Sequence, residues 1–292
     1  MKHNASWHGT SGSVAVMSDE NSTTPAAEFT PHLMLGDLLF TEVPTVDDVI
    51  AKVTDVPEDV GVTAQAVDGK DGVIEVQIAK FGVTAFLTVI DAPVPNQEAE
   101  QNAHQLYCQG DDLERISTHG AQILIAVPPE FTGEPAEQIV DLTARQTQLT
   151  VARVHGMVTM ALSRLPGLAG YYSGTSAATF GLPFLHQVVS GQFGSTPWPL
   201  WVSAWLRPGP EGFSAYTYGL WSMGHPELQV ENTRMAPEDL FMFLMDTVAY
   251  LILDEGTFED GQSTGRTAEE VFTLHAEPWI VDEDVPAFRI GM

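Results

Sequence analysis

Hydrophobic and polar residues alternate along several stretches of the chain, as they do in strands that bury one face of a sheet. The clearest case is 73–79, where valine and isoleucine alternate with glutamate and glutamine. Residues 83–90 are apolar almost throughout, which predicts a central strand covered on both faces. Further strands are expected at 35–42, 62–68, 119–127 and 168–173, in three segments between 198 and 231 of which the last is 227–231, and at 271–276 and 287–290.

Apolar residues spaced by three and four positions predict the helices. One follows Thr45, which resembles a capping residue because Asp47 and Asp48 lie in the first turn behind it. A long helix is expected to begin at Pro135 and to end before Pro166. The remaining helices are expected at 96–107, near 180–193, and from Pro237 with Glu238 and Asp239 in its first turn.

The order of these elements repeats. Strand, helix, three strands, helix and strand describe 35–127, and the same order describes 168–276, with the long helix between them. We therefore predict an α+β fold of two similar β-α-β-β-β-α-β halves with mainly antiparallel sheet, in a single domain over 33–292. Residues 1–30 have no apolar period and are expected to form a flexible N-terminal tail, and Met1 and Met17 are both open as the natural start.

Charge narrows the possible partners. The chain has 12 Lys and Arg residues against 39 Asp and Glu residues, a formal net charge of −27. This charge argues against nucleic acid and anionic membranes as partners, because both are bound through clustered cations. It fits either a solubility or salt adaptation, or a surface that attracts a basic protein partner.

Cysteine content and hydropathy predict the compartment. Cys108 is the only cysteine, so no intrachain disulfide can form and a reducing compartment is expected. No apolar run reaches the roughly 18 to 20 residues of a membrane span, and no signal peptide is evident. We expect a cytoplasmic protein, with its oligomeric state open.

Three short patterns suggest chemistry only weakly. His104 and Cys108 would share a helix face, but no further metal ligands lie near them, so a buried structural thiol is the better interpretation. Residues 174–178 (GTSAA) depart from a nucleophile elbow at the last position. Residues 256–263 have the glycine spacing of a phosphate loop, but Gln262 replaces its lysine. We assign no catalytic residue, cofactor or metal ligand.

An aromatic and acidic cluster lies in the 198–231 region. Aromatic residues at alternating strand positions usually fill a core, and a binding surface is the alternative. The members of the cluster are Trp201, Trp205, Tyr216, Tyr218, Trp221, His225 and Glu227.

A family resemblance rests on three motifs: Tyr-Thr-x-Gly-Leu at 216–220, Gly-x-x-Glu-Leu at 224–228 and Asp-Gly-x-x-x-Gly at 260–265. These motifs, with similar runs at 38–42 and 199–202, resemble a bacterial family of unknown function, number 4261 among the domains of unknown function. The resemblance implies one cytoplasmic α+β unit and no established activity.

We predict a non-catalytic interaction protein, of an immunity-like or regulatory kind, that uses its acidic surface against a protein partner. The alternative is an uncharacterised enzyme, a hydrolase, with its site near 216–231 and 260–265. The candidate functional residues are His225, Glu227, Tyr216, Tyr218 and Asp260.

Overall fold

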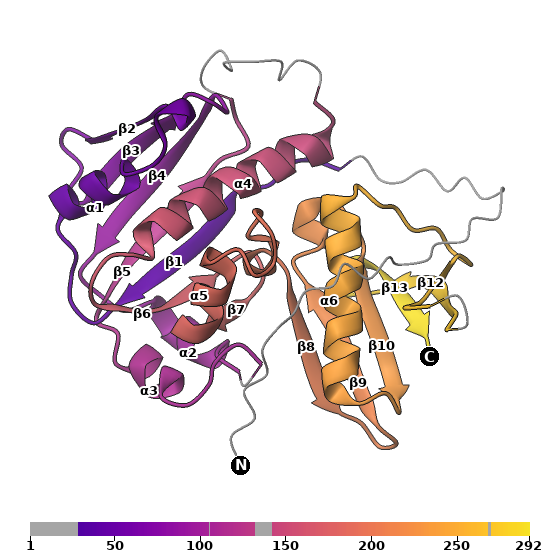
Figure 1. Ribbon diagram of the computed structural model, residues 1–292. Coiled ribbons are helices and arrows are strands. Elements are labelled where there is room, and N and C mark those ends of the chain that lie inside the picture. The colour runs from indigo at the N-terminus through magenta and orange to yellow at the C-terminus, as the bar shows by residue number, and fades with distance from the viewer. Residues whose placement is uncertain (1–28, 105, 132–141, 268–269) are drawn as a thin grey trace. The chain divides into compact units, whose positions relative to one another are not determined.

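The computed structural model of the chain describes residues 29–104, 106–131, 142–267 and 270–292. These residues divide into a first unit, Thr30–Trp201, and a second unit, Val202–Met292. Each unit contains one sheet with helices packed on it, and each is described by itself (Figure 1).

The first unit is built on a seven-stranded sheet in the order β2-β3-β4-β5-β1-β6-β7, and neighbouring strands run antiparallel. Strand β1 lies in the interior of the sheet. Leu38 and Leu39 point to its two opposite faces, and both side chains are apolar and fully buried. The strands are β1 Met34–Phe40, β2 Val62–Ala66, β3 Val73–Ile78, β4 Val83–Ile90, β5 Ala121–Val127, β6 Leu168–Ser173 and β7 Ala178–Phe180.

Helices cover both faces of this sheet. Leu38 pairs with Tyr171, whose ring lies 6.2 Å from His155 of the long helix α4, so this face packs against α4. Leu39 points to the opposite face, where it joins an apolar cluster with Ile116 of α3. The helices are α1 Val46–Val53, α2 Glu98–Gln101, α3 Asp112–Ser117, α4 Ala144–Leu162 and α5 Leu182–Val189, with 3₁₀ turns at Glu58–Val60, Pro95–Gln97 and Trp198–Leu200.

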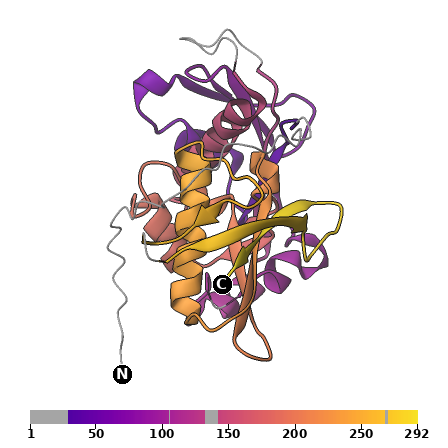
Figure 2. The same cartoon turned by 90° about the vertical axis from the view of Figure 1, so that its right-hand side faces the viewer.

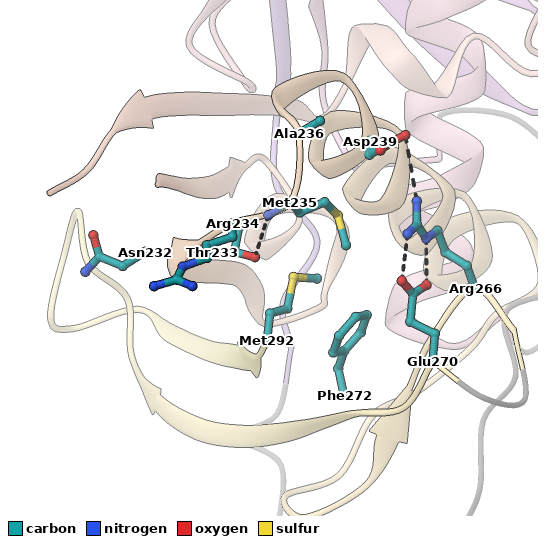
Figure 3. A pocket seen from close by; sticks show the side chains of 10 residues that line it. All are labelled: Asn232, Thr233, Arg234, Met235, Ala236, Asp239, Arg266, Glu270, Phe272 and Met292. Atoms are coloured by element: carbon teal, nitrogen blue, oxygen red, sulfur yellow. Dashed lines mark hydrogen bonds and ion pairs between the residues drawn. The ribbon is translucent and has the colours of Figure 1, made fainter. Parts of the chain in front are cut away.

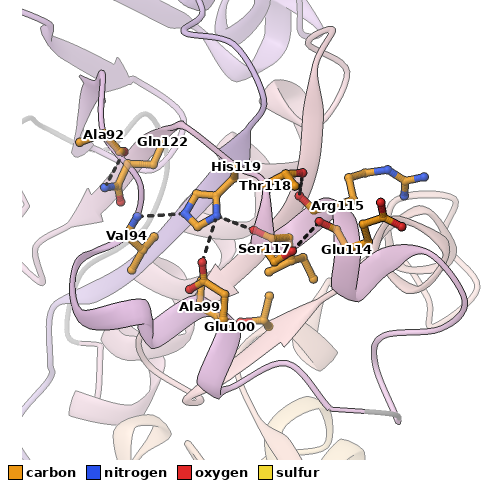
Figure 4. A network of polar contacts seen from close by, with 12 residues as sticks. Ala92, Val94, Ala99, Glu100, Glu114, Arg115, Ser117, Thr118, His119 and Gln122 are labelled. Carbon is orange, nitrogen blue, oxygen red and sulfur yellow. Dashed lines mark hydrogen bonds and ion pairs between the residues drawn. The ribbon is translucent and has the colours of Figure 1, made fainter.

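A buried histidine joins the loop before α2 to the segment after α3 (Figure 4). The amide of Val94 donates to Nε2 of His119 over 2.9 Å, so Nε2 carries no proton. Nδ1 therefore carries the proton and donates it to the carbonyl of Ile116 over 2.6 Å, with Glu100 Oε1 3.6 Å away. Because both ring nitrogens are used within the fold, His119 is a structural residue.

The second unit contains a six-stranded sheet in the order β11-β12-β13-β10-β9-β8. Its strands are drawn in orange and yellow in Figure 2. Strands β10 and β13 run parallel, and the other neighbours run antiparallel. The elements are β8 Ser203–Pro208, β9 Phe213–Tyr218, β10 Glu227–Thr233, α6 Pro237–Leu253, β11 Ser263–Thr264, β12 Phe272–Pro278 and β13 Pro286–Gly291, with a 3₁₀ turn at Trp221–Met223.

Helix α6 packs on one face of this sheet. Phe243 of α6 meets Phe272 of β12 at a ring distance of 5.5 Å, which identifies the face that carries Phe272 as the inner one. Strand alternation and the pairing register place the other inner residues. They are uncharged and include Ala204, Ala215, Thr217, Leu228, Val230, Leu274, Phe288 and Ile290, all buried.

The α+β class with mainly antiparallel sheets is confirmed. The predicted halves at 35–127 and 168–276 do not match the two sheets, however. Strands β6 and β7 of the second half complete the first sheet, and β13, which lies beyond that half, occupies the centre of the second. The reason is that β6 is buried on both faces and needs an interior place, which β1 and β7 provide.

Two predicted helices need correction. Residues 96–107 do not form one helix, because Asn96 and Gln97 adopt left-handed backbone angles and α2 is only four residues long. The long helix begins at Ala144 after Thr143, whose extended backbone and reciprocal bonds with Gln146 form a capping box. The predicted start at Pro135 lies outside the described residues.

Candidate functional site

The connection between β9 and β10 is held together by the carboxylate of Glu227. Its Oε2 accepts a hydrogen bond from Thr217 Oγ1 over 2.6 Å, and its Oε1 accepts from the amides of Gly219 and Trp221 over 2.9 Å each. Thr217 Oγ1 in turn accepts from the amide of Leu228 over 2.8 Å. The Glu227 carboxylate therefore has a structural role, because its hydrogen bonds hold the two strands and the turn of its own hairpin together.

The backbone of this connection explains the remaining motif residues. Gly219 and Gly224 have φ values of 114° and 84°, which glycine adopts without a side-chain clash. The amide of His225 donates to the carbonyl of Leu220, which is fully buried. Thus the Tyr-Thr-x-Gly-Leu and Gly-x-x-Glu-Leu motifs encode one hydrogen-bonded hairpin.

The carboxyl group of Glu227 and the imidazole of His225 are both buried at this turn. Glu227 is 1% exposed and His225 is 5% exposed, so both predicted site residues lie inside the fold. Burial raises the pKa of the Glu227 carboxyl, while its hydrogen bonds from Thr217 and Trp221 act in the opposite direction. The turn therefore presents neither of these two candidate side chains to solvent.

The third motif has its own structural role. Asp260 is exposed, and its Oδ1 accepts a hydrogen bond from the amide of Ala276 on β12 over 2.8 Å. A Cβ at Gly265 would lie 1.5 Å from the carbonyl oxygen of Glu270, so only glycine fits there. These contacts attach the loop after α6 to β12, and they give Asp260 and Glu227 different partners. The hydrolase alternative therefore gains no support from these residues.

The outer face of the six-stranded sheet, opposite α6, brings the two predicted tyrosines together. Tyr216 and Tyr218 alternate with buried Ala215 and Thr217, so both point to this face, and both are half-buried. Trp279 packs edge-on against them, with ring distances of 6.1 Å to Tyr216 and 5.0 Å to Tyr218. Trp205 pairs with Tyr216 across β8 and β9 and extends the same aromatic surface.

A polar network holds Trp279 in place. Gln229, which pairs with Tyr216, donates from Nε2 to Glu277 Oε1 over 2.5 Å and accepts from the amide of Ile280 over 2.8 Å. Arg289 Nε donates to Glu277 Oε2 over 3.0 Å. The strand residues on both sides of the β12–β13 loop are thereby fixed, so the loop carries Trp279 in a defined position.

The tip of the β12–β13 loop is both apolar and acidic. Ile280 and Val281 are 39% and 49% exposed, and Asp282, Glu283 and Asp284 follow them. Burial raises the pKa of the Tyr218 hydroxyl, and the nearby charges of Glu227 and Asp282 raise it further. Trp279 packs on Tyr218, and the acidic tip follows Trp279 directly in the chain. We call this set, Trp205, Tyr216, Tyr218 and residues 279–284, the outer aromatic surface. Trp279 itself is only 4% exposed and packs within this set.

A pocket of about 620 Å³ lies elsewhere in the second unit, between the end of β10, the first turn of α6 and β12 (Figure 3). Arg266 is its central cation. The guanidinium makes two hydrogen bonds of 2.6 Å with Glu270 and lies 3.9 Å from Asp239. Because these two carboxylates already balance its charge, Arg266 is poorly suited to bind an anion.

The weaker sequence patterns are structural as well. Cys108 is buried, its thiol donates to the carbonyl of Thr179 over 3.2 Å, and burial raises its pKa to about 11. This confirms the buried thiol. Ser176 of the elbow-like stretch is fully buried, so it presents no nucleophile to solvent.

Sequence reasoning found the tyrosines of the outer aromatic surface but missed Trp279 and Gln229. Trp279 is distant in sequence from β9, and the sequence signal that could have found it is an apolar run, Trp279 to Val281, directly before three acids. In the part of the chain that the structure describes, no three His, Cys, Asp or Glu side chains are grouped as metal ligands would be. Among the same residues, no helix combines the length and apolarity of a membrane span.

Comparison with known proteins identifies a family relationship. Residues 216–290 match the sequence model of a family described as a domain of unknown function, DUF4261. The match contains all three motifs, the second half of β9, and strands β10 to β13 except the last residue of β13, whereas the similar runs at 38–42 and 199–202 lie outside it. No curated protein and no solved structure matches the chain. Residues 216–290 of this chain therefore belong to the DUF4261 family.

Proposed function

We propose that this chain is a non-catalytic interaction protein of the cytoplasm that binds a basic protein partner through the outer aromatic surface. The observation that carries the proposal is the position of Tyr216, Tyr218 and Trp205 beside two exposed apolar residues and three consecutive acids. Tyrosine and tryptophan anchors inside a polar rim are typical of the residues that dominate binding energy at protein interfaces.

Charge supports a basic partner. Residues 202–292 contain four arginines and no lysine against sixteen acidic residues, so the second unit has a negative field of its own. Such a field accelerates the approach of a positively charged protein and weakens as salt is added. Aromatic faces next to carboxylates also favour arginine and lysine side chains, because the ring face attracts a cation.

The experiment compares capture by the immobilised full chain and by two variants, Tyr218→Ala and Trp205→Ala, from host lysate at low salt. Phe86→Ala is the matched control, because Phe86 is a 39% exposed aromatic residue of the first unit. We expect a basic protein bound by the wild type and by Phe86→Ala, lost from both surface variants, and released by moderate salt. Equal capture by all four chains, or capture of no protein, would contradict the proposal.

A further inference from the structure

The edges of the two sheets differ in how they are closed. At β7, the amide of Thr179 donates to the carbonyl of Asn102 and the amide of Gly181 to that of Tyr107, so a neighbouring segment occupies this edge. Strand β8 ends in Arg207 and Pro208, a charge and a proline, which are common means of preventing strand addition. Strand β11 is only two residues long. The fourth edge is β2.

Strand β2 directs half of its backbone groups away from the sheet. It pairs with β3 in an antiparallel register in which Thr63 lies opposite Gln77 and Gln65 opposite Glu75. The bonds from Ala79 N to Gly61 O and from Val67 N to Val73 O show that the odd-numbered residues form the hydrogen-bonded pairs. The N–H and C=O groups of Val62, Ala64 and Ala66 therefore face outward.

No protective feature blocks this edge within β2. Its sequence, VTAQA, contains no charge, proline or glycine, and its pairing with β3 has no bulge. Among the residues that the structure describes, no backbone hydrogen bond reaches the amides or carbonyls of Val62, Ala64 or Ala66. Figure 1 shows β2 as the outermost strand of its sheet. A row of outward donors and acceptors of this kind is a template for another strand.

We propose that the β2 edge binds an extended segment of a basic protein partner, which adds to the seven-stranded sheet as an eighth strand. This proposal does not depend on the outer aromatic surface. Main-chain hydrogen bonds from Val62, Ala64 and Ala66 would supply the affinity, and charge would select the segment.

The charges around β2 favour a basic occupant. Acidic residues flank the strand in the sequence on both sides and outnumber the nearest lysines: Asp55, Glu58, Asp59, Asp68 and Asp71 against Lys52, Lys70 and Lys80. Lys52 lies 3.6 Å from Asp55. Lys80 is already paired with Asp59 at 3.1 Å. A hollow of about 100 Å³ on the outer face of β2 and β3 contains Glu75, within reach of a lysine or arginine on the added strand. A second copy of the chain would instead bring like charges together.

The test uses two synthetic probes, a peptide of alternating valine and lysine and its valine–glutamate counterpart, with the full chain. We expect the basic peptide to bind and the acidic one to bind at least about tenfold more weakly. Hydrogen exchange should slow at the amides of Val62, Ala64 and Ala66 when the basic peptide is added, since these amides become donors. Unchanged exchange at these amides, or equal binding of both peptides, would overturn the proposal.

Ala64→Pro tests the edge directly. It removes an outward N–H and leaves the β2–β3 bonds of Thr63 and Gln65, so proline is compatible with this position. We expect a loss of affinity on the order of tenfold or more, whereas Ala64→Ser, which retains the N–H, should bind like the wild type. Unaltered binding by a folded Ala64→Pro chain would refute the proposal.

Peptide binding by Glu75→Lys and self-association of the wild-type chain are two further measurements that test the β2 edge. If Ala64→Pro does not fold, Glu75→Lys is the second variant. This substitution should weaken binding of the basic peptide and strengthen binding of the acidic peptide. An effect of Glu75→Lys in the reverse direction, or none, would count against the basic occupant. Self-association of the wild-type chain that Ala64→Pro abolishes would also overturn the proposal, because the occupant would then be a second copy.

Discussion

Replacement of Glu227 by alanine should destabilise the second unit strongly, because one carboxylate holds the β9–β10 hairpin together. The carboxylate accepts from the hydroxyl of Thr217 and from the amides of Gly219 and Trp221. An unpaired buried donor costs about 1–3 kcal/mol. The buried amide of Gly219 loses its acceptor, and the buried hydroxyl of Thr217 keeps only the carbonyl of Leu228 at 3.4 Å, whereas Trp221 is half-buried and can turn to water. The expected loss is therefore about 3–5 kcal/mol in the free energy of unfolding.

Denaturant unfolding of wild type, Glu227→Ala and Glu231→Ala measures this loss. Glu231 is the matched control because it is an exposed glutamate on the same strand, and its replacement should change stability by no more than about 0.5 kcal/mol. Thr217→Val should fall between the two, since it leaves the amide of Leu228 without its acceptor. If Glu227→Ala and Glu231→Ala unfold alike, the structural interpretation of the family motifs is wrong.

Three further predictions concern buried or crowded positions. Burial and the nearby charge of Glu98 raise the pKa of Asp37 from 3.8 to about 7, so the folded chain retains a proton that the unfolded chain loses, and stability should fall as pH rises across that window. Asp37→Asn should therefore stabilise the chain at pH 8 by a few kcal/mol relative to wild type and leave it almost unchanged at pH 4, as measured by denaturant unfolding; an equal effect at both pH values would refute the assignment. The Cys108 thiol should resist alkylation at pH 8 until the chain is unfolded, since its pKa is about 11, and rapid labelling of the native chain would contradict its burial. Gly265→Ala should lower stability by about 2–3 kcal/mol and Gly120→Ala by much less, because a Cβ at Gly120 meets its nearest atom only at 3.8 Å; equal melting temperatures would show that the loop at Gly265 relaxes freely.

Local patterns predicted the local elements well. The alternation at 73–79 became β3, the apolar run 83–90 became β4, and Pro237 begins α6 as expected. Each of these depends on residues close together in the chain, where periodicity and caps determine the outcome. The helix expected at 96–107 is wrong at both ends, because Asn96 and Gln97 adopt left-handed backbone angles before it and α2 already ends at Gln101. Periodicity alone does not reveal either boundary.

Pairing between distant strands was not predictable in the same way. Nothing local indicates that β6 joins β1 or that β13 runs parallel to β10, because both pairings depend on which apolar faces remain to be covered. The candidate site shows the same limit. Tyr216 and Tyr218 are recognisable from alternation, but Trp279 and the burial of Glu227 depend on contacts across a loop and a hairpin.

Hydrogen exchange of the full chain, alone and bound to the basic protein that it captures, tests the proposed function most directly. The proposal predicts slower exchange of backbone amides at 205–218 and 279–285, around the outer aromatic surface, and little change in α6, which covers the opposite face. Protection confined to other segments, with 279–285 exchanging at the rate of the unbound chain, would contradict it.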